Sequence, residues 1–336
     1  MNLNTSVKDT AFADKIFSVS EKNFTETALA LFQFQYANNP VYQRYCQTLH
    51  VDVDQVDGIE KIPFVPINFF KTHEVKTTAF ETDIVFESSG TTQTINSKHF
   101  VKDVSIYEQS FTQAFEIFYG KEYCILALLP SYLERNNSSL VMMADKLIKN
   151  SNHPKSGFYL NNLSELNNIL QKLEKDQQPT LLLGATFALL DLAEKFPMPL
   201  HYTTIMETGG MKGRRKEITR AEVHQILSKS FSVNKIHSEY GMTELLSQAY
   251  SKGDGIFNYP PWMKILIREE DDPLFVQSSQ DAKTINGAIN IIDLANIYSC
   301  AFIATEDAGK LFSDESFEIL GRLDNSDIRG CSLLTL

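Results

Sequence analysis

The sequence predicts an α/β fold with a mainly parallel sheet and a β-rich part towards its C-terminus. In the first two thirds, short apolar runs such as residues 123–129 alternate with segments of helical periodicity such as residues 138–149. Strands separated by helix-length segments pair in parallel through crossover connections. From about residue 256 the pattern changes to strand signals separated by Gly, Asn and Asp, as in residues 288–292. This second pattern predicts an antiparallel β-subdomain.

The predicted elements follow one another along the whole chain. Apolar residues at helical intervals predict a helix over residues 24–45, whereas Pro63 and Pro66 exclude a regular helix from residues 61–70, which we expect to be extended. The remaining predictions are strands at residues 84–86, 180–183 and 205–207 and helices at residues 105–119 and 185–195. We therefore divide the chain into an N-terminal helical and extended cap (1–80), a central domain (81–320) and a short tail (321–336).

A polar loop directly follows the predicted strand at residues 84–86. It consists of Ser88, Ser89, Gly90, Thr91 and Thr92. Glycine lets the backbone approach an anion closely, while hydroxyls and successive N–H groups donate to phosphate oxygens. The loop therefore favours phosphate binding, although Ser, Thr and Gly also gather in ordinary turns.

Lys98 lies a few residues beyond this loop. A lysine is a mobile point charge that can follow the same phosphates.

A second polar loop, Tyr240-Gly241-Met242-Thr243-Glu244, occurs far along the chain. Gly241 permits a turn, and the following two leucines begin what we expect to be a helix. Near a helix start, the Glu244 carboxylate can hold Mg²⁺ while Thr243 meets a phosphate oxygen. The two loops together predict an ATP site.

Five segments, in order, resemble the acyl-adenylate-forming superfamily. They are residues 88–92, 207–213, 240–244, 303–309 and 321–330. The resemblance implies the large domain of these enzymes over residues 81–320, with ATP and Mg²⁺ as cofactors and Glu244 as the metal ligand. It further implies that the nucleotide is bound by residues of the later segments: Gly209, Gly210 and Tyr240 at adenine, Gly241 and Thr243 beside the phosphates, and Asp307 and Arg322 at the ribose.

Within that superfamily the chain is similar to the LuxE-type acyl-protein synthetases, the fatty acid component of bacterial luminescence systems. The similarity lies in residues 129–135, 207–214, 237–244 and 329–334. Two departures stand out, since Gln93 replaces a further glycine and Lys98 follows Ser97 rather than a proline. The similarity implies ATP-dependent activation of a carboxylic acid, by implication a fatty acid, as acyl-AMP.

The C-terminal segment suggests how the acyl group leaves. The CoA ligases of the superfamily carry a further lid domain, whereas this sequence stops shortly after Gly330, so we expect that lid to be truncated. In LuxE-type proteins a cysteine near the C-terminus accepts the acyl group, and the match falls on Cys331, where Arg329 favours the thiolate. The alternative is that Cys331 is a small apolar residue packed beside the neighbouring leucines.

Three functions remain open on the sequence alone. The first is an acyl-protein synthetase that acylates its own Cys331. The second is a ligase or acyltransferase that passes the acyl group to CoA or to a partner protein such as an acyl reductase. The third is a non-catalytic homologue that binds acyl groups or nucleotides.

Composition narrows the setting in which these functions would operate. The 336 residues are 43% hydrophobic, and the net charge of −11 disfavours a nucleic-acid or anionic-membrane surface. Four cysteines without metal-ligand spacing suit a reducing cytoplasm. No secretory signal and no apolar run of membrane-spanning length is present.

Two further residues have alternative roles. His237 precedes the second loop and either lines the acyl pocket or packs within a strand. Arg135 lies where a strand gives way to a helix, so it either meets phosphate or the acyl carboxylate, or belongs to a loop in which Asn136 or Asn137 caps that helix.

Overall fold

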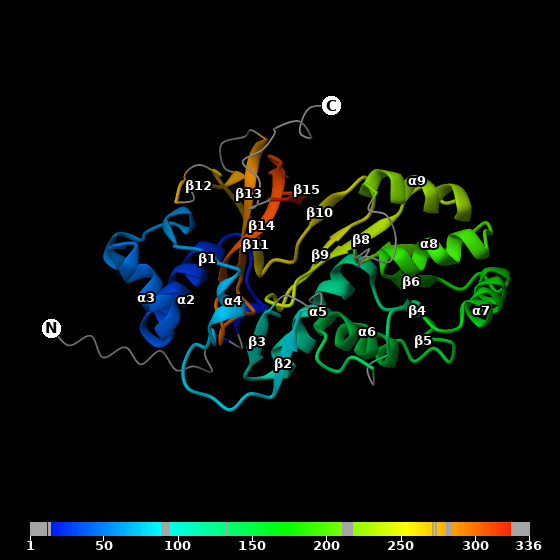
Figure 1. The fold of residues 1–336 in the computed structure, drawn as a ribbon, viewed down its shortest axis with the longest axis horizontal. Coiled ribbons are helices and arrows are strands. Elements are labelled where there is room, and N and C mark those ends of the chain that lie inside the picture. The colour runs from blue at the N-terminus through cyan, green and yellow to red at the C-terminus, as the bar shows by residue number, and fades with distance from the viewer. Residues whose placement is uncertain are drawn as a thin grey trace.

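The computed structural model describes Phe12 and residues 15–88, 95–131, 134–209, 218–270, 272, 274–279 and 284–323. A thirteen-stranded sheet runs through this part of the chain in the order β12-β11-β13-β14-β15-β10-β9-β8-β7-β6-β4-β5, with β1 beside β14. Figure 1 shows two halves, an α/β half in green and an antiparallel half in orange and red that lies between it and the blue N-terminal helices.

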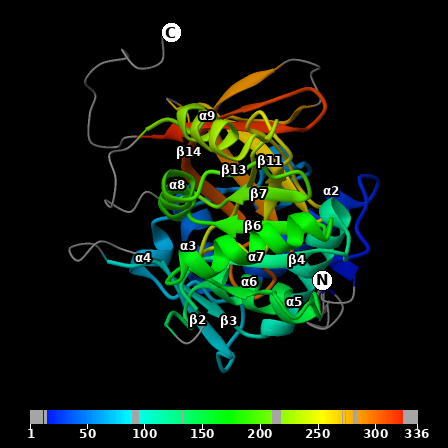
Figure 2. The same ribbon diagram turned by 90° about the vertical axis from the view of Figure 1, so that its right-hand side faces the viewer.

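The α/β half contains the parallel strands, which Figure 2 views side by side. They are β4 (Cys124–Leu128), β5 (Gly157–Phe158), β6 (Thr180–Gly184), β7 (Thr203–Glu207) and β8 (His237–Tyr240). Strands β4 and β6 are buried along their whole length, as expected for parallel strands covered on both faces. The predicted α/β fold class is therefore confirmed.

Five helices accompany these strands. They are α5 (Val104–Tyr119), α6 (Ser139–Asn150), α7 (Leu163–Lys175), α8 (Thr186–Lys195) and α9 (Arg220–Phe231). The chain moves one way along the sheet from β4 to β5 and the other way from β5 to β8. Because such crossovers are right-handed, α6 lies on the opposite face from α7, α8 and α9.

The antiparallel half begins where β8 meets β9. Its strands are β9 (Ala249–Ser251), β10 (Ile256–Asn258), β11 (Met263–Arg268), β12 (Val276–Gln277), β13 (Ile285–Asp293), β14 (Phe302–Leu311) and β15 (Phe317–Arg322). The predicted antiparallel strands are confirmed, but they continue the parallel sheet instead of forming a sheet of their own. The loop of residues 241–248 joins the two halves.

The N-terminal segment packs on the antiparallel half. It contains α2 (Phe24–Asn38), α3 (Pro40–Thr48), 3-10 turns at Val53–Gln55 and Ile59–Lys61, β1 (Val65–Pro66) and α4 (Phe69–Thr72). The one helix expected over residues 24–45 is two, because the Asn39 side chain caps α3 and Pro40 opens it. Only the centre of the expected extended segment is a strand. Buried Gln35 fixes α2 through bonds to Asn296 and Ile297.

Strands β2 (Ile84–Glu87) and β3 (Lys98–Val101) form a separate antiparallel hairpin. Just beyond them, Ser88 N–H donates to the Ser97 carbonyl at 3.1 Å, and Ser97 N–H donates to Ser88 Oγ at 2.9 Å. The predicted strand before the first polar loop is confirmed, and these two bonds close the base of that loop.

One local prediction is wrong, and two helices were not predicted. The helix expected after Glu244 is wrong, because the chain enters β9 at Ala249, and the backbone N–H groups of Leu246 and Ser247 bond a buried carboxylate on the way. Helices α7 and α9 were not anticipated. The spacing of Leu166, Ile169 and Leu170 in α7 is the signal that would have revealed one of them.

No helix in the described ranges is both long and apolar enough to cross a membrane.

Candidate active site

A cavity of about 800 Å³ opens where the sheet changes from parallel to antiparallel. Its wall includes the residues that directly follow β4, β6, β7 and β8, such as Leu129, Ala185, Thr208 and Gly241. The carboxyl ends of parallel strands at a change of topology are the usual binding position in open α/β sheets, and the volume suits one small-molecule site.

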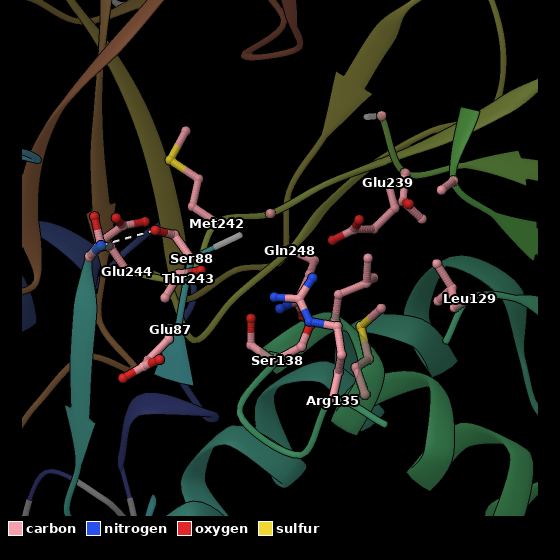
Figure 3. A pocket seen from close by; sticks show the side chains of 18 of the residues that line it. Glu87, Ser88, Leu129, Arg135, Ser138, Glu239, Met242, Thr243, Glu244 and Gln248 are labelled. Carbon is pink, nitrogen blue, oxygen red and sulfur yellow. Dashed lines mark hydrogen bonds between the residues drawn. The ribbon is translucent and has the colours of Figure 1, made fainter. Parts of the chain in front are cut away.

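Six of the residues expected to bind ATP come together in this wall. They are Ser88, Gly209, Gly241, Thr243, Glu244 and Arg322. Figure 3 shows Ser88, Thr243 and Glu244 gathered at one end, with Glu239 and Leu129 at the other. The remaining predicted loop residues and the predicted acceptor lie outside the described part of the chain: Ser89, Gly90, Thr91, Thr92, Gly210 and Cys331.

Glu244 occupies the first end of the cavity and is 6% exposed. Burial raises the pKa of its carboxyl, while a hydrogen bond to Ser97 and the charges of Lys71 and Arg322 act in the opposite direction. Within the described residues no three His, Cys, Asp or Glu side chains gather to form a metal cage. A single carboxylate instead suits Mg²⁺, which keeps waters and binds through one or two carboxylates and substrate phosphates.

The backbone of the Glu244 loop is held first by His99. Its Nδ1 lies 2.8 Å from the carbonyl oxygen of Thr243, and its Nε2 lies 3.0 Å from Ser299 Oγ. A carbonyl oxygen only accepts, so Nδ1 carries the proton and Nε2 accepts from the Ser299 hydroxyl. Burial lowers the pKa of His99 to about 4, which keeps the ring neutral.

Two more buried side chains hold the same loop. The Asn296 amide donates to the Glu244 carbonyl at 2.9 Å. Asp293, fully buried, accepts from the N–H groups of Leu246 and Ser247 at 2.8 and 3.0 Å and from the Ser247 hydroxyl at 2.6 Å. Thr243 and Glu244 are thus fixed by three side chains from β3 and the β13–β14 region, and the loop is ordered before any ligand arrives.

A second cluster lies behind the cavity wall at β14 and β15. The Tyr240 hydroxyl donates to Asp307 at 2.8 Å, and Arg322 Nε lies 3.9 Å from the same carboxylate. Burial raises the pKa of Asp307, while the Tyr240 hydrogen bond and the Arg322 charge lower it. The Tyr240 ring packs edge-on against Phe257 and Phe317. Arg322 is the member of this cluster that lines the cavity.

The glycine turn after β7 rests on a buried carboxylate. Glu207 accepts from Thr186 at 2.8 Å and from Gly209 N–H at 3.2 Å, and Arg220 lies 3.7 Å away. Although burial raises the pKa of Glu207, the contacts with His224, Thr186 and Arg220 outweigh it and the pKa is lowered. Gly209 has φ +71°, a conformation that favours glycine. The ionised Glu207 therefore fixes this turn at the cavity wall.

Lys98 does not line the cavity. Neighbouring residues on a strand point to opposite faces, so on β3 the buried His99 turns towards Thr243 while Lys98 is exposed. Its Nζ lies 3.9 Å from Glu87. The cation that sequence reasoning missed is Lys71 of α4, which lines the cavity and acts on the Glu244 charge.

The other end of the cavity is lined by four polar residues, and of these only Arg135 was a candidate binding residue in the sequence analysis. Arg135, Ser138, Glu239 and Gln248 line it. Neither asparagine caps α6, because Ser138 holds the N-cap position without a side-chain bond and Asn137 bonds Glu87 instead. Glu239 lies within a segment that carries the family similarity, but it was given no role, and Gln248 lies in a segment without a sequence signal.

His237 packs within the fold. Its Nδ1 lies 3.1 Å from the Tyr119 hydroxyl, and burial, with Lys252 and Lys235, lowers its pKa to about 4. It is not part of the cavity wall.

A comparison with protein-family models assigns the chain to a family. The model of one family, described as acyl-protein synthetase, LuxE, matches residues 5–335. The chain belongs to this family. A comparison with curated proteins found no match.

Two solved structures that resemble this LuxE-family chain were determined with an adenylate or with ATP bound. A 2-hydroxyisobutyryl-CoA ligase in the postadenylation state, in complex with 2-HIB-AMP, has a TM-score of 0.61 at 11% identity and covers 93% of this chain and 70% of its own. ATP-bound MatB from Rhodopseudomonas palustris has a TM-score of 0.53 at 12% identity, over 73% and 48%. At these identities the likeness shows a common fold, and the chain spans about half the length of MatB.

Proposed function

We propose that this LuxE-family protein uses ATP to activate a small carboxylic acid as acyl-AMP. The observation that carries the proposal is the meeting of Ser88, Thr243, Glu244 and Arg322 in one cavity at the switch of the sheet. These residues come from segments far apart in the sequence, and they offer the hydroxyl donors, carboxylate and guanidinium that bind a nucleoside triphosphate and its metal.

The residues divide the nucleotide among them. Ser88 and Thr243 donate to phosphate oxygens, as do the loop residues Ser89, Thr91 and Thr92. Lys71 supplies the mobile cation in place of Lys98. Glu244 holds Mg²⁺, which when bound neutralises phosphate charge. The ribose lies against Asp307 and Arg322. We assign adenine to Gly209, Gly210 and Tyr240.

The first step is a displacement at the α-phosphorus. A carboxylate oxygen of the acid forms a bond to that phosphorus, the bond to the bridging oxygen breaks, and pyrophosphate leaves. The work of the chain is to position and stabilise charge, because phosphoryl transfer needs little covalent chemistry from the protein. The fixed backbone of Thr243 and Glu244 meets this need.

The second step transfers the acyl group to a thiol. The Cys331 thiol gives its proton to solvent, the thiolate attacks the acyl carbon, AMP leaves with the bonding pair, and a thioester remains. A partner such as an acyl reductase or acyltransferase would then receive the group, in a reducing cytoplasm that keeps the thiol free.

The experiment is acid-dependent exchange of labelled pyrophosphate into ATP, followed by intact-mass measurement. We expect exchange with at least one acid and a hydroxylamine-sensitive mass increase that maps to Cys331. Cys331→Ser should still exchange pyrophosphate but gain no thioester. If pyrophosphate exchanges but the acyl group is released only when CoA is added, CoA is the acceptor instead of Cys331. If no acid supports exchange, the proposed adenylation is wrong.

A further inference from the structure

The two faces of β8 separate the nucleotide side of the cavity from a second side. Alternate residues of a strand point to opposite faces. Tyr240 points to Asp307 and β14, so Glu239 points the other way, towards α5, where its charge acts on Tyr107. The space for Glu239 depends on Gly241, since a Cβ on Gly241 would lie 2.6 Å from Glu239 Oε1 and 3.3 Å from Gln248 Cγ.

This second side carries three polar groups that the described chain leaves unpaired. Gln248 is 3% exposed, and its Oε1 has no hydrogen-bond partner, although its side chain also bonds Tyr107. The Arg135 guanidinium and the Glu239 carboxyl likewise have no hydrogen bond or ion pair to any described residue. Figure 3 shows Arg135, Gln248 and Glu239 among the side chains that line the cavity. Gln248 Oε1 is buried, and buried polar groups are normally paired. Arg135 and Glu239 are half-buried and line the same cavity, so the three groups together point to a ligand that completes them.

Apolar side chains surround the three groups. Leu129, Leu140, Met143 and Leu160 line the cavity with them. Such walls can cover a short carbon stem while a few polar groups orient it, the usual composition of a small-molecule site. An unsubstituted alkyl chain in the same place would leave a guanidinium and a buried amide oxygen without partners.

We propose that the activated acid is a small oxygenated one, which carries a hydroxyl, carbonyl or second carboxyl group bound by Arg135, Gln248 and Glu239, and is not a plain fatty acid. This inference rests on the proposed function, because it names the substrate class of the same cavity. Arg135 donates hydrogen bonds to oxygen lone pairs of the substituent, and Gln248 Oε1 accepts a hydrogen bond where that substituent is a hydroxyl. Burial and the charge of Glu207 raise the pKa of Glu239 to about 8, so at neutral pH its carboxyl can also donate.

The test is pyrophosphate exchange with acids matched for chain length. One series is plain alkanoates from short to long, a second is hydroxy and keto acids, and a third is dicarboxylates. We expect kcat/KM for the best oxygenated acid to exceed that of the alkanoate of equal length by at least about 100-fold, because a site built for hydrogen bonds rejects analogues that lack them. The second and third series distinguish a neutral from an anionic substituent. A long alkanoate as the best substrate would overturn the inference and leave the proposed function intact.

Two variants assign the residues. Arg135→Leu and Gln248→Met should each lower kcat/KM for the oxygenated acid by about 10-fold or more and change it for the matched alkanoate by less than about 3-fold. Arg44→Leu, on the exposed surface of α3, is the matched control and should behave as the parent. An equal loss for both acids in Arg135→Leu would place its guanidinium at the reacting carboxylate or at phosphate, and would overturn its part in selection. Thermal unfolding of each variant checks that the fold is retained.

Discussion

The two ends of the cavity differ in how completely the protein satisfies its own polar groups. At the Glu244 end, His99, Asn296 and Asp293 bond the backbone of residues 243–247 with every distance between 2.8 and 3.0 Å. At the Glu239 end, a guanidinium, a carboxyl and a buried amide oxygen have no partner in the described chain. Within the described chain, other side chains hold the backbone of the first end, whereas we infer that a ligand completes the second.

This difference in pairing suggests that the Glu244 end serves the reaction and the Glu239 end serves the selection of the acid. Phosphoryl transfer needs fixed donors, because a group that must reorganise at the moment of reaction stabilises the transition state less. Selection needs groups whose pairing depends on the ligand, because only a difference in pairing distinguishes one acid from another. Variants at the two ends should therefore fail in different ways.

The largest effect is expected from Glu244→Gln. Loss of the carboxylate that we assign to the metal should raise the barrier by about 3 kcal/mol and slow pyrophosphate exchange about 100-fold, for every acid alike. Glu21→Gln, an exposed carboxylate far from the cavity, is the control. Exchange by Glu244→Gln at a rate near that of the parent would mean that the metal is held elsewhere.

His99 should make the Glu244 end sensitive to acid. Its pKa is lowered to about 4 by burial, so it must take up a proton on unfolding once the pH falls below about 6.5. Stability is therefore lost as pH falls from about 6.5 to about 4, by up to about 3 kcal/mol.

Urea unfolding at about pH 6.5 and at about pH 4 measures this loss of stability. His99→Gln should be less stable than the parent at neutral pH but should lose less on acidification. Asn296→Ala, which removes another bond to the same loop and no titratable group, should keep the parental pH dependence. If His99→Gln also keeps the parental pH dependence, a group other than His99 causes the loss of stability in acid.

A tenfold effect is expected at the ribose. Asp307→Ala should raise the KM for ATP about 10-fold, because a charged hydrogen bond contributes about 1.5–3 kcal/mol. The parent should use 2′-deoxy-ATP poorly, and the variant should discriminate less between the two nucleotides. Equal penalties for ATP and 2′-deoxy-ATP in the variant would remove Asp307 from the ribose site.

The smallest effect is confined to the acid end. A Cβ at residue 241 would displace the Glu239 carboxyl, so Gly241→Ala should raise the KM for the acid about 3- to 10-fold and leave the KM for ATP near the parental value. Steady-state kinetics with each substrate varied in turn measure the two constants. A rise confined to the KM for ATP would show that Gly241 borders the nucleotide and not the acid.

Local sequence patterns were enough for much of the fold and for the nucleotide end. Apolar runs and helical periods located β4, β6, β7, α5, α6 and α8 within one or two residues, since β4 and β6 are buried along their whole length and the helices bury apolar residues at helical spacing. Motif residues such as Thr243, Glu244 and Arg322 were expected together and meet in one cavity. Their chemistry is carried by short contiguous segments, so a linear pattern reveals it.

Only the tertiary structure decided which side chains face the cavity. Lys98 and His99 are neighbours in the sequence, yet the pleat of β3 exposes the lysine and turns the histidine to Thr243. The expected helix after Glu244 is absent because the chain turns back into β9, which begins at Ala249 and pairs with β8, so only residues 245–248 separate Glu244 from that strand. The unpaired set of Arg135, Glu239 and Gln248 comes from three separate segments. Whether a polar group is paired depends on atoms brought close by folding, which no local pattern records.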